Sequence, residues 1–203
     1  MDGILPFLTD TLFSNPWETI AVVLALLYLV LAVKQHISCW LAAFVSSLIY
    51  TFLYWDVGLF MFSLLNIFYV LMAIYGWCSW LGYFSNNDHL PVKRWSLQQH
   101  LIAITIILAA TYAVGSFLKA HSNVPYIDAF ITFGAVVTTY MVSRKVLENW
   151  VYWLVINSFA IYLNIDKGFH QTALLYVIYH VLSVIGFISW RRSFYNPSHV
   201  STD

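Results

Sequence analysis

Two tryptophans and two asparagines share one face of a predicted helix over residues 147–164. Trp150, Trp153, Asn157 and Asn164 follow at spacings of three, four and seven residues, which place all four on one side of an α-helix. Indole faces bind flat rings, cationic rings especially, and carboxamides donate and accept hydrogen bonds. An Asn buried in hydrocarbon is costly unless it finds a partner. The stripe is therefore either a set of contacts between helices or the wall of a binding site.

The composition shows what kind of protein must position this stripe. The chain has 203 residues, of which 61% are hydrophobic and only 9% are charged, whereas a soluble domain has roughly 25% charged residues. We therefore expect a polytopic membrane protein. The net charge is zero, which gives no indication of a nucleic-acid partner. Cys39 and Cys78 lack the spacing of metal ligands, so we expect neither a metal site nor a cofactor.

Seven apolar runs are long enough to cross a hydrocarbon core of about 30 Å. They lie near residues 18–34, 39–55, 58–80, 99–118, 126–143, 147–164 and 171–190. The predicted fold is an all-α polytopic membrane protein with seven transmembrane helices. Residues 1–16 are expected to form an amphipathic leader and residues 82–98 a long polar linker. Residues 193–203 are expected to form a tail, disordered from Phe194 onwards.

The basic residues are distributed unevenly between the two sides of such a protein. With seven spans, the C-terminal side receives Lys34, Lys93, Arg94, Arg144, Lys145, Arg191 and Arg192, and the N-terminal side receives Lys119 and Lys167. Cytoplasmic loops carry the excess of Lys and Arg. The pattern therefore predicts that the N-terminus lies outside and the C-terminus inside.

The chain also repeats itself at a shift of 110 residues. The matched pairs include Trp40 with Trp150, Asp56 with Asp166, Gly58 with Gly168, Gly76 with Gly186, and Trp80 with Trp190. We interpret residues 17–80 and 126–192 as two copies of a three-helix unit, joined by a segment over 81–125 that contains the polar linker and a connecting fourth helix. This 3+1+3 plan gives two parallel repeats, and transporters built this way bind substrate near the midplane, at the interface between repeats.

Two tryptophan motifs carry a resemblance to a known family. ENWxxW comprises Glu148, Asn149, Trp150 and Trp153, and YGWxxW runs from Tyr75 to Trp80. With Asp128 opening the fifth span, they make the chain resemble the PnuC-type vitamin transporters (the nicotinamide riboside transporter family) over residues 17–192. The resemblance implies a SWEET-like fold, a homotrimer in the bacterial inner membrane, and facilitated diffusion followed by trapping through a cytoplasmic vitamin kinase.

Members of this family carry nicotinamide riboside, thiamine or riboflavin, and three positions bear on the choice. Asn66 stands where many nicotinamide riboside members have Gln, a second Gln of those members falls near Thr139, and Leu154 stands where they often have a polar residue. A changed set of hydrogen-bonding side chains suggests a changed substrate. The resemblance therefore favours thiamine (vitamin B1), with nicotinamide riboside as the alternative.

The candidate substrate-binding residues are aromatic or polar side chains placed within the predicted spans. They are Trp153, Asn157, Trp150, Asn66, Tyr69, Tyr50, Thr139, Tyr176 and His180. Four of them have a stated structural alternative. For Trp150 it is an aromatic belt at the membrane interface, and for Asn66, Asn157 and His180 it is a hydrogen bond between helices. The mate of Trp150 in the first repeat is Trp40, whereas Trp153 is matched by Ala43. Trp153 and Asn157 are therefore the leading candidates.

Four further residues are expected to have gating or structural roles. Glu148 and Asp128 lie at span ends, where they can pair with Arg144 or Lys145 or cap helices. Gly76 and Gly186 permit close approach of helices and could act as pivots. All acidic residues fall in loops or near span ends, whereas ion-coupled carriers usually need buried carboxylates. This pattern favours an uncoupled uniporter.

Two other classes of protein compete with a transporter. An intramembrane enzyme would need a catalytic motif, but the sequence has no HExxH, no GxSxG and no acidic pair within a span. A receptor or structural subunit has no need for an internal duplication with polar faces. We therefore expect a transporter and not an enzyme.

Overall fold

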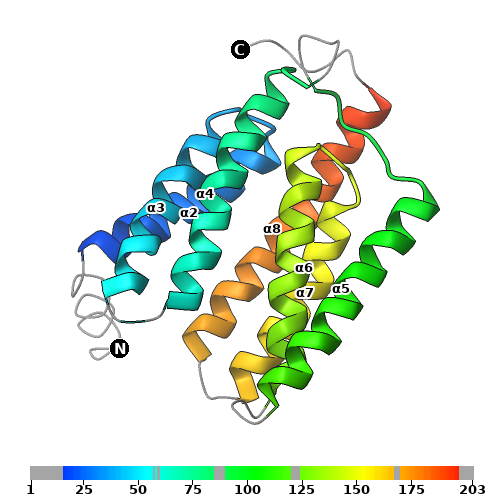
Figure 1. Cartoon of the computed structure of the whole chain (residues 1–203). Coiled ribbons are helices and arrows are strands. Elements are labelled where there is room, and N and C mark those ends of the chain that lie inside the picture. The colour runs from blue at the N-terminus through cyan, green and yellow to red at the C-terminus, as the bar shows by residue number, and fades with distance from the viewer. Residues whose placement is uncertain are drawn as a thin grey trace, which may run out of the picture. The chain divides into compact units, whose positions relative to one another are not determined.

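The computed structural model describes residues 16–56, 58, 60–84, 90–119, 124–166 and 170–196. Within these ranges the chain forms seven helices, labelled in Figure 1. They are α2 (Pro16–Val33), α3 (Cys39–Asp56), α4 (Phe60–Trp80), α5 (Leu97–Leu118), α6 (Pro125–Ser143), α7 (Asn149–Asp166) and α8 (His170–Tyr195). The helices belong to two compact units, Met1–Leu81 and Gly82–Asp203.

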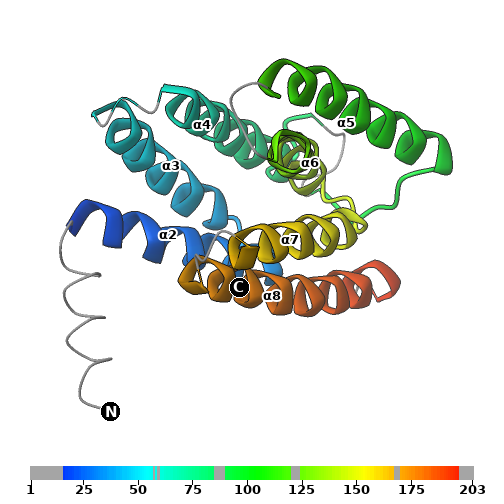
Figure 2. The ribbon, with the colours of Figure 1, turned by 90° about the horizontal axis from the view of Figure 1, so that it is seen from below.

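In the first unit, α3 packs against both α2 and α4 (Figure 2). Small residues bring these helices close, among them the buried Ala21, Ala42 and Ala73. Two serine hydroxyls bridge the helices: Ser46 Oγ donates to the carbonyl of Ala21 over 2.8 Å, and Ser63 Oγ to that of Thr51 over 2.9 Å. In lipid the hydrophobic effect does not drive helices together, so close packing of small residues and hydrogen bonds between helices hold them in contact.

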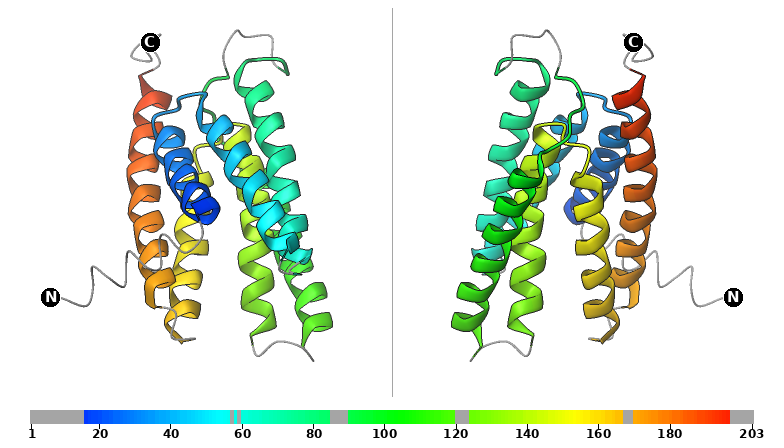
Figure 3. Two further views of the ribbon diagram at one scale, coloured as in Figure 1. Left: turned by 90° about the vertical axis from the view of Figure 1, so that its left-hand side faces the viewer. Right: turned by 90° about the vertical axis from the view of Figure 1, so that its right-hand side faces the viewer.

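In the second unit, each helix packs against the next one along the chain. Figure 3 shows α7 and α8 side by side in both of its views. A capping box starts α5, because Ser96 Oγ accepts from the Gln99 amide while the Gln99 side chain accepts from the Ser96 amide. Pro125 opens α6 at a position where its missing N–H costs nothing. The local sequence therefore sets both of these helix starts.

The same three-residue cluster occurs once in each unit. Trp40 packs on Gly76 and meets Trp80 edge to face, with ring centroids 5.4 Å apart. Trp150 packs on Gly186 and meets Trp190 in the same way, also at 5.4 Å. All four indoles are buried. These clusters occupy the positions that the 110-residue shift pairs.

The turns before α3 and α7 are also alike. Gln35 has φ 57° and Lys145 has φ 48°, and these residues are 110 positions apart. The left-handed region is uncommon for residues other than glycine. Positions related by the 110-residue shift therefore share the same left-handed turn, just before α3 and just before α7.

The seven helices agree with the seven predicted segments to within a few residues at most of their ends, and six of them are long and apolar enough to span a membrane. The exception is α7, which carries Asn149, Asn157, Asn164 and Asp166. At 18 residues it measures about 27 Å. The one described helix that does not meet this criterion is therefore the helix that carries the leading candidates, Trp153 and Asn157.

One sequence expectation was wrong. Phe194 and Tyr195 were expected in a disordered tail, but they form the last turn of α8. A basic residue in that turn, Arg192, complements the helix dipole, and the Arg191 guanidinium lies 5.9 Å from the centre of the Tyr195 ring. The helix therefore continues past its apolar part. Residues 1–15 of the predicted leader and residues 197–203 of the tail lie outside the described residues, and Pro16 is the first residue of α2.

Candidate functional site

The predicted stripe runs along α7, between α6 and α8 in the second unit. Trp150 is 1% exposed and belongs to the cluster with Gly186. Trp153, one turn further on, is only half-buried. Asn164 donates to the carbonyl of Ala160 in its own helix over 2.7 Å. Trp150 is therefore packed inside its cluster, whereas the Trp153 indole is partly open, and substrate binding by either stays a prediction.

Asn157 lies at the middle of α7 and is 3% exposed. Its Nδ2 donates to Ser183 Oγ on α8 over 3.4 Å, which is long for a hydrogen bond. Ser183 Oγ in turn donates to the carbonyl of Tyr179 over 2.8 Å. The contact between helices that we weighed from the sequence is therefore present. A contact of this length is weak, and substrate binding by Asn157 stays a prediction.

Neighbouring helices of the second unit contribute three more candidates. Thr139 on α6 is buried and donates to the carbonyl of Ala135 in its own helix over 2.8 Å. Tyr176 on α8 meets Tyr179 edge to face. His180 Nδ1 is buried and, within the described part of the chain, has no hydrogen-bond partner. The sequence suggested that His180 donates to a neighbouring helix, and this nitrogen does not.

The remaining three candidates belong to the first unit. Asn66 is 9% exposed, and its Nδ2 donates to the carbonyl of Phe62 in its own helix over 2.8 Å. Tyr50 on α3 stacks on Tyr54, with centroids 5.6 Å apart and planes 15° apart. Tyr69 is half-buried on α4, one turn after Asn66. The structure therefore groups the nine candidates into a set of three and a set of six.

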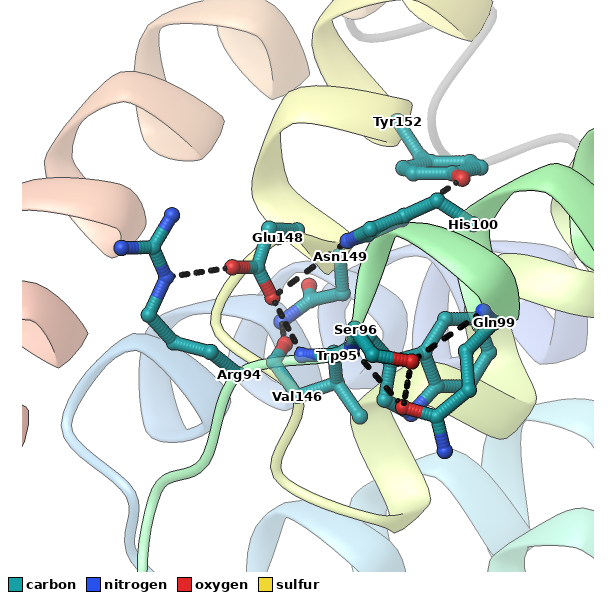
Figure 4. A network of polar contacts seen from close by, with 9 residues as sticks. All are labelled: Arg94, Trp95, Ser96, Gln99, His100, Val146, Glu148, Asn149 and Tyr152. Carbon is teal, nitrogen blue, oxygen red and sulfur yellow. Dashed lines mark hydrogen bonds and ion pairs between the residues drawn. The ribbon is translucent and has the colours of Figure 1, made fainter.

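Glu148 precedes α7 and is the hub of a polar network (Figure 4). Its Oε1 accepts from Arg94 Nε over 2.7 Å, and its Oε2 accepts from the Trp95 amide over 3.2 Å. His100 Nε2 lies 4.0 Å from Oε2. The hydrogen bond and charge of Glu148 raise the pKa of the Arg94 guanidinium, with a further contribution from Tyr195. Glu148 thus has a structural role, with Arg94 as its partner where the sequence suggested Arg144 or Lys145.

A backbone contact runs beside this network. The Lys93 amide donates to the carbonyl of Lys145 over 3.0 Å, and the Leu147 amide donates to the carbonyl of Lys93 over 2.8 Å. The two bonds hold the strained turn at Lys145 in place. Burial, and then the charge of Arg144, lower the pKa of the Lys93 ammonium. The end of the polar linker is therefore fixed to the turn between α6 and α7.

Sequence reasoning missed three members of this network: Trp95, His100 and Tyr152. His100 Nδ1 lies 3.0 Å from the Tyr152 hydroxyl, and the two rings stack with 24° between their planes. The Trp95 ring meets His100 edge to face. The capping-box pattern SxxQ at Ser96–Gln99 was the available signal, because it starts α5 two residues before the predicted span and so places His100 in the first turn.

Asp128, Gly76 and Gly186 lie where their expected roles require. Asp128 is in the first turn of α6, where a carboxylate is favourable to the helix dipole. The two glycines allow the indoles of Trp40 and Trp150 to lie against a neighbouring helix backbone. A role in gating stays a prediction for all of them.

Comparison with known proteins identifies the family. The family described as "Nicotinamide mononucleotide transporter" matches residues 15–192. The chain belongs to this family. The PnuC-type resemblance is confirmed, and the protein is a multi-pass transporter of the bacterial inner membrane and not an enzyme.

Three similar proteins are named for what they transport. The nicotinamide riboside transporter PnuC of Escherichia coli is 21% identical, over 87% of this chain and 85% of its own length. The PnuC protein of Neisseria mucosa is 24% identical, over 86% and 71%. The riboflavin/roseoflavin transporter RibM of Streptomyces davaonensis is 30% identical, but the match spans only 59% of this chain and 58% of RibM.

A solved structure shares the fold. The chain superposes on the crystal structure of the vitamin B3 transporter PnuC with a TM-score of 0.71 and 22% sequence identity, covering 96% of this chain and 88% of the other. The all-helical PnuC fold is therefore shown.

Proposed function

We propose that this protein is a uniporter for a vitamin with a flat heteroaromatic ring. The observation that carries the proposal is the polar face of α7, where a half-buried Trp153 and a buried Asn157 lie on the one described helix too polar to qualify as a span by composition. Indole faces hold flat or cationic rings, each contact contributing about 0.5–2 kcal/mol. Family membership supports transport as the use of this face.

The positions of the basic residues argue that the substrate is not a phosphate ester. The basic residues of the described part of the chain lie at helix ends or in connections and none lies within the middle of a helix: Lys34, Lys93, Arg94, Lys119, Arg144, Lys145, Arg191 and Arg192. A buried phosphate needs cationic or multiple N–H partners. We infer that the vitamin is carried without its phosphate. Phosphorylation by a cytoplasmic kinase then traps it.

Two observations favour different vitamins. The PnuC relatives that match over most of their length are described as nicotinamide riboside transporters. Asn66, Thr139 and Leu154 depart from the polar residues of many such transporters, and this favours thiamine. Both substrates offer a flat cationic ring and hydroxyl groups, so the face on α7 suits either. We carry thiamine and nicotinamide riboside as the two candidates.

A binding titration tests the proposal. Purified protein is titrated with thiamine, nicotinamide riboside, riboflavin and the phosphate monoesters of the first two, by calorimetry and by tryptophan fluorescence. We expect one of the first two vitamins to bind at least about tenfold more tightly than any other ligand, which corresponds to ~1.4 kcal/mol. Absence of binding by all three unphosphorylated vitamins would reject the proposed substrate class.

Uniport is inferred from the positions of the carboxylates. In the described residues Glu18, Asp56, Asp128, Glu148 and Asp166 lie at helix ends or in connections. Coupling to an ion or proton gradient usually needs such groups within the membrane. Among the candidate residues within the described spans, His180 is the one histidine.

Vitamin uptake into liposomes is therefore expected to be unaffected by a sodium gradient or by a pH gradient. Uptake should equilibrate the vitamin and then stop, and vitamin kinase enclosed in the liposomes should restore accumulation. The measurement is the final ratio of internal to external vitamin. A ratio well above one under either gradient, with no kinase present, would contradict uniport.

The finer architecture belongs to the same proposal. We infer seven spans in a 3+1+3 arrangement, with the N-terminus outside and the C-terminus inside, assembled as a homotrimer. The distribution of basic residues supports the orientation, and the Trp–Gly–Trp clusters at shifted positions support the repeat. The trimer rests on the family resemblance.

A further inference from the structure

The head of α7 is joined to the polar linker by a clamp, which we define as Arg94, His100, Glu148 and Tyr152. Among the described helices, α5 packs on α6 and not on α7. The clamp nevertheless reaches α7 from the linker and from the first turn of α5, through the Arg94–Glu148 ion pair at 2.7 Å and the His100–Tyr152 contact at 3.0 Å. Side chains rather than packed helices therefore connect α5 to α7.

The clamp is special to the second repeat. At a shift of 110 residues, Glu148 is matched by Ser38, Tyr152 by Ala42, and the leading candidate Trp153 by Ala43. The strained turn before the helix is the same in both copies. The turn and the tryptophan cluster are therefore present at both sets of positions. Glu148, Tyr152 and Trp153 have no counterpart of the same type in the first unit.

The head of α7 has few other polar anchors. Both oxygens of Glu148 are engaged with Arg94 and the Trp95 amide, which belong to the linker rather than to α7 itself. Asn149 is fully buried, and its Nδ2 donates to the carbonyl of Val146. Its Oδ1 is buried without a partner among the described residues. The first turn of α7 thus depends on contacts with the linker to hold its position.

We propose that the clamp positions α7 for vitamin binding. Tyr152 is directly followed by Trp153, and Asn157 lies just over one turn further along. Consecutive residues of a helix point about 100° apart, so fixing Tyr152 against His100 fixes the direction in which Trp153 points. The positioning residues are the four members of the clamp: Arg94, His100, Glu148 and Tyr152. Through His100, helix α5 supports the site without touching the vitamin. This inference rests on the proposed function.

The test uses two variants of the full-length protein and one control. Glu148→Gln removes the ion pair with Arg94. Tyr152→Phe removes only the hydroxyl that faces His100 and keeps the stacked ring. The control is Glu18→Gln, which changes an acidic residue in the first turn of α2, in the other unit. Hydrogen exchange is measured without vitamin, and vitamin affinity is measured by calorimetry.

In both variants we expect exchange at residues 149–155 to quicken by about tenfold, while residues 158–166 keep the wild-type rate, because local opening follows the loss of local contacts. We expect the vitamin Kd to rise about threefold to tenfold, with melting temperatures close to wild type. The control should change none of these. A purely structural role would lower the melting temperature without this local pattern.

Three results would overturn parts of this inference in different ways. Unchanged exchange in both variants would show that the clamp does not hold the head of α7. Faster exchange with an unchanged Kd would show that it holds the helix but does not position the vitamin site. If the wild-type protein binds none of the vitamins, the proposed function fails and the positioning role fails with it, whereas the exchange measurement still decides whether the clamp exists.

Discussion

Replacing Trp153 by alanine is expected to weaken vitamin binding by about tenfold to a hundredfold while the protein still folds. A ring stacked on an indole contributes ~1–2 kcal/mol when the contact is desolvated, and tenfold in affinity is ~1.4 kcal/mol. Trp153 is half-buried and lies outside the tryptophan cluster of its unit, so its loss should cost little stability. The measurements are the Kd by calorimetry and the melting temperature.

The matched control is Trp17→Ala, because Trp17 is 62% exposed on α2. Its removal deletes the same side chain from a surface position and should leave the Kd unchanged. Equal losses of affinity in both variants would point to a general effect on the protein. Wild-type affinity for Trp153→Ala would remove this residue from the proposed site.

Asn157→Ala belongs to the same prediction and needs its own control. We expect it to weaken vitamin binding strongly. Without the Asn157 carboxamide, the polar group of the vitamin that it contacts would be buried without a hydrogen-bond partner. Ser183→Ala removes the partner that Asn157 contacts at 3.4 Å and leaves Asn157 itself intact. If the two variants lose affinity equally, Asn157 acts through its contact with α8 rather than on the vitamin.

Replacing Gly186 by alanine is expected to lower the melting temperature by about 5 °C or more. A Cβ at this position would lie 2.6 Å from Trp150 Cε2, too close for van der Waals contact. The indole cannot move aside, because Trp150 and Trp190 are 1% and 0% exposed and meet edge to face. Overpacking of this kind costs ~1–3 kcal/mol, and each kcal/mol lowers the melting temperature by roughly 2–4 °C in a chain of this size.

Gly134→Ala is the control for this substitution. A Cβ at Gly134 would meet Ile156 Cδ1 at 3.0 Å, and the end of an isoleucine side chain can shift by a few tenths of an ångström. We therefore expect a much smaller change in melting temperature. Gly76→Ala should behave like Gly186→Ala, because it meets the indole of Trp40 in the first unit. Wild-type stability for Gly186→Ala would contradict the packing described for the cluster.

Most of the helices could be predicted from the sequence, because a helix that crosses lipid must be a long and locally apolar segment. Seven apolar segments were long enough to span, and each corresponds to a helix with bounds close to those expected. Gly76 and Gly186 were expected to permit close approach of helices because glycine has no side chain, and each lies against a tryptophan. The end of α8 was predicted too early, because Phe194 and Tyr195 were assigned to a disordered tail. Arginine in the last turn of a helix is favourable to the helix dipole, and α8 continues to Tyr195.

The candidate site was only partly predictable, because spacing gives the face of a helix and not what that face meets. The spacing of Trp150 and Trp153 predicted a shared stripe, but tertiary packing buries the first in a cluster and leaves the second half-open. The pairing of Glu148 with Arg94 joins residues 54 positions apart. No local pattern specifies such a partner, since ion pairs between connections depend on how the chain returns.

By itself, the sequence determined that this protein lies in a membrane, that it consists of long apolar helices, that segments 110 residues apart are similar, and that the segment of α7 carries a polar stripe. These follow from hydrophobicity, period and internal similarity, which are properties of local sequence. Tertiary structure alone decided that Trp150 is buried in a cluster with Gly186 and Trp190, that Asn157 contacts Ser183 on α8, and that the linker is joined to the residues that open α7. These depend on which side chains meet across helices, and that is fixed only when the packed bundle places them within hydrogen-bonding distance.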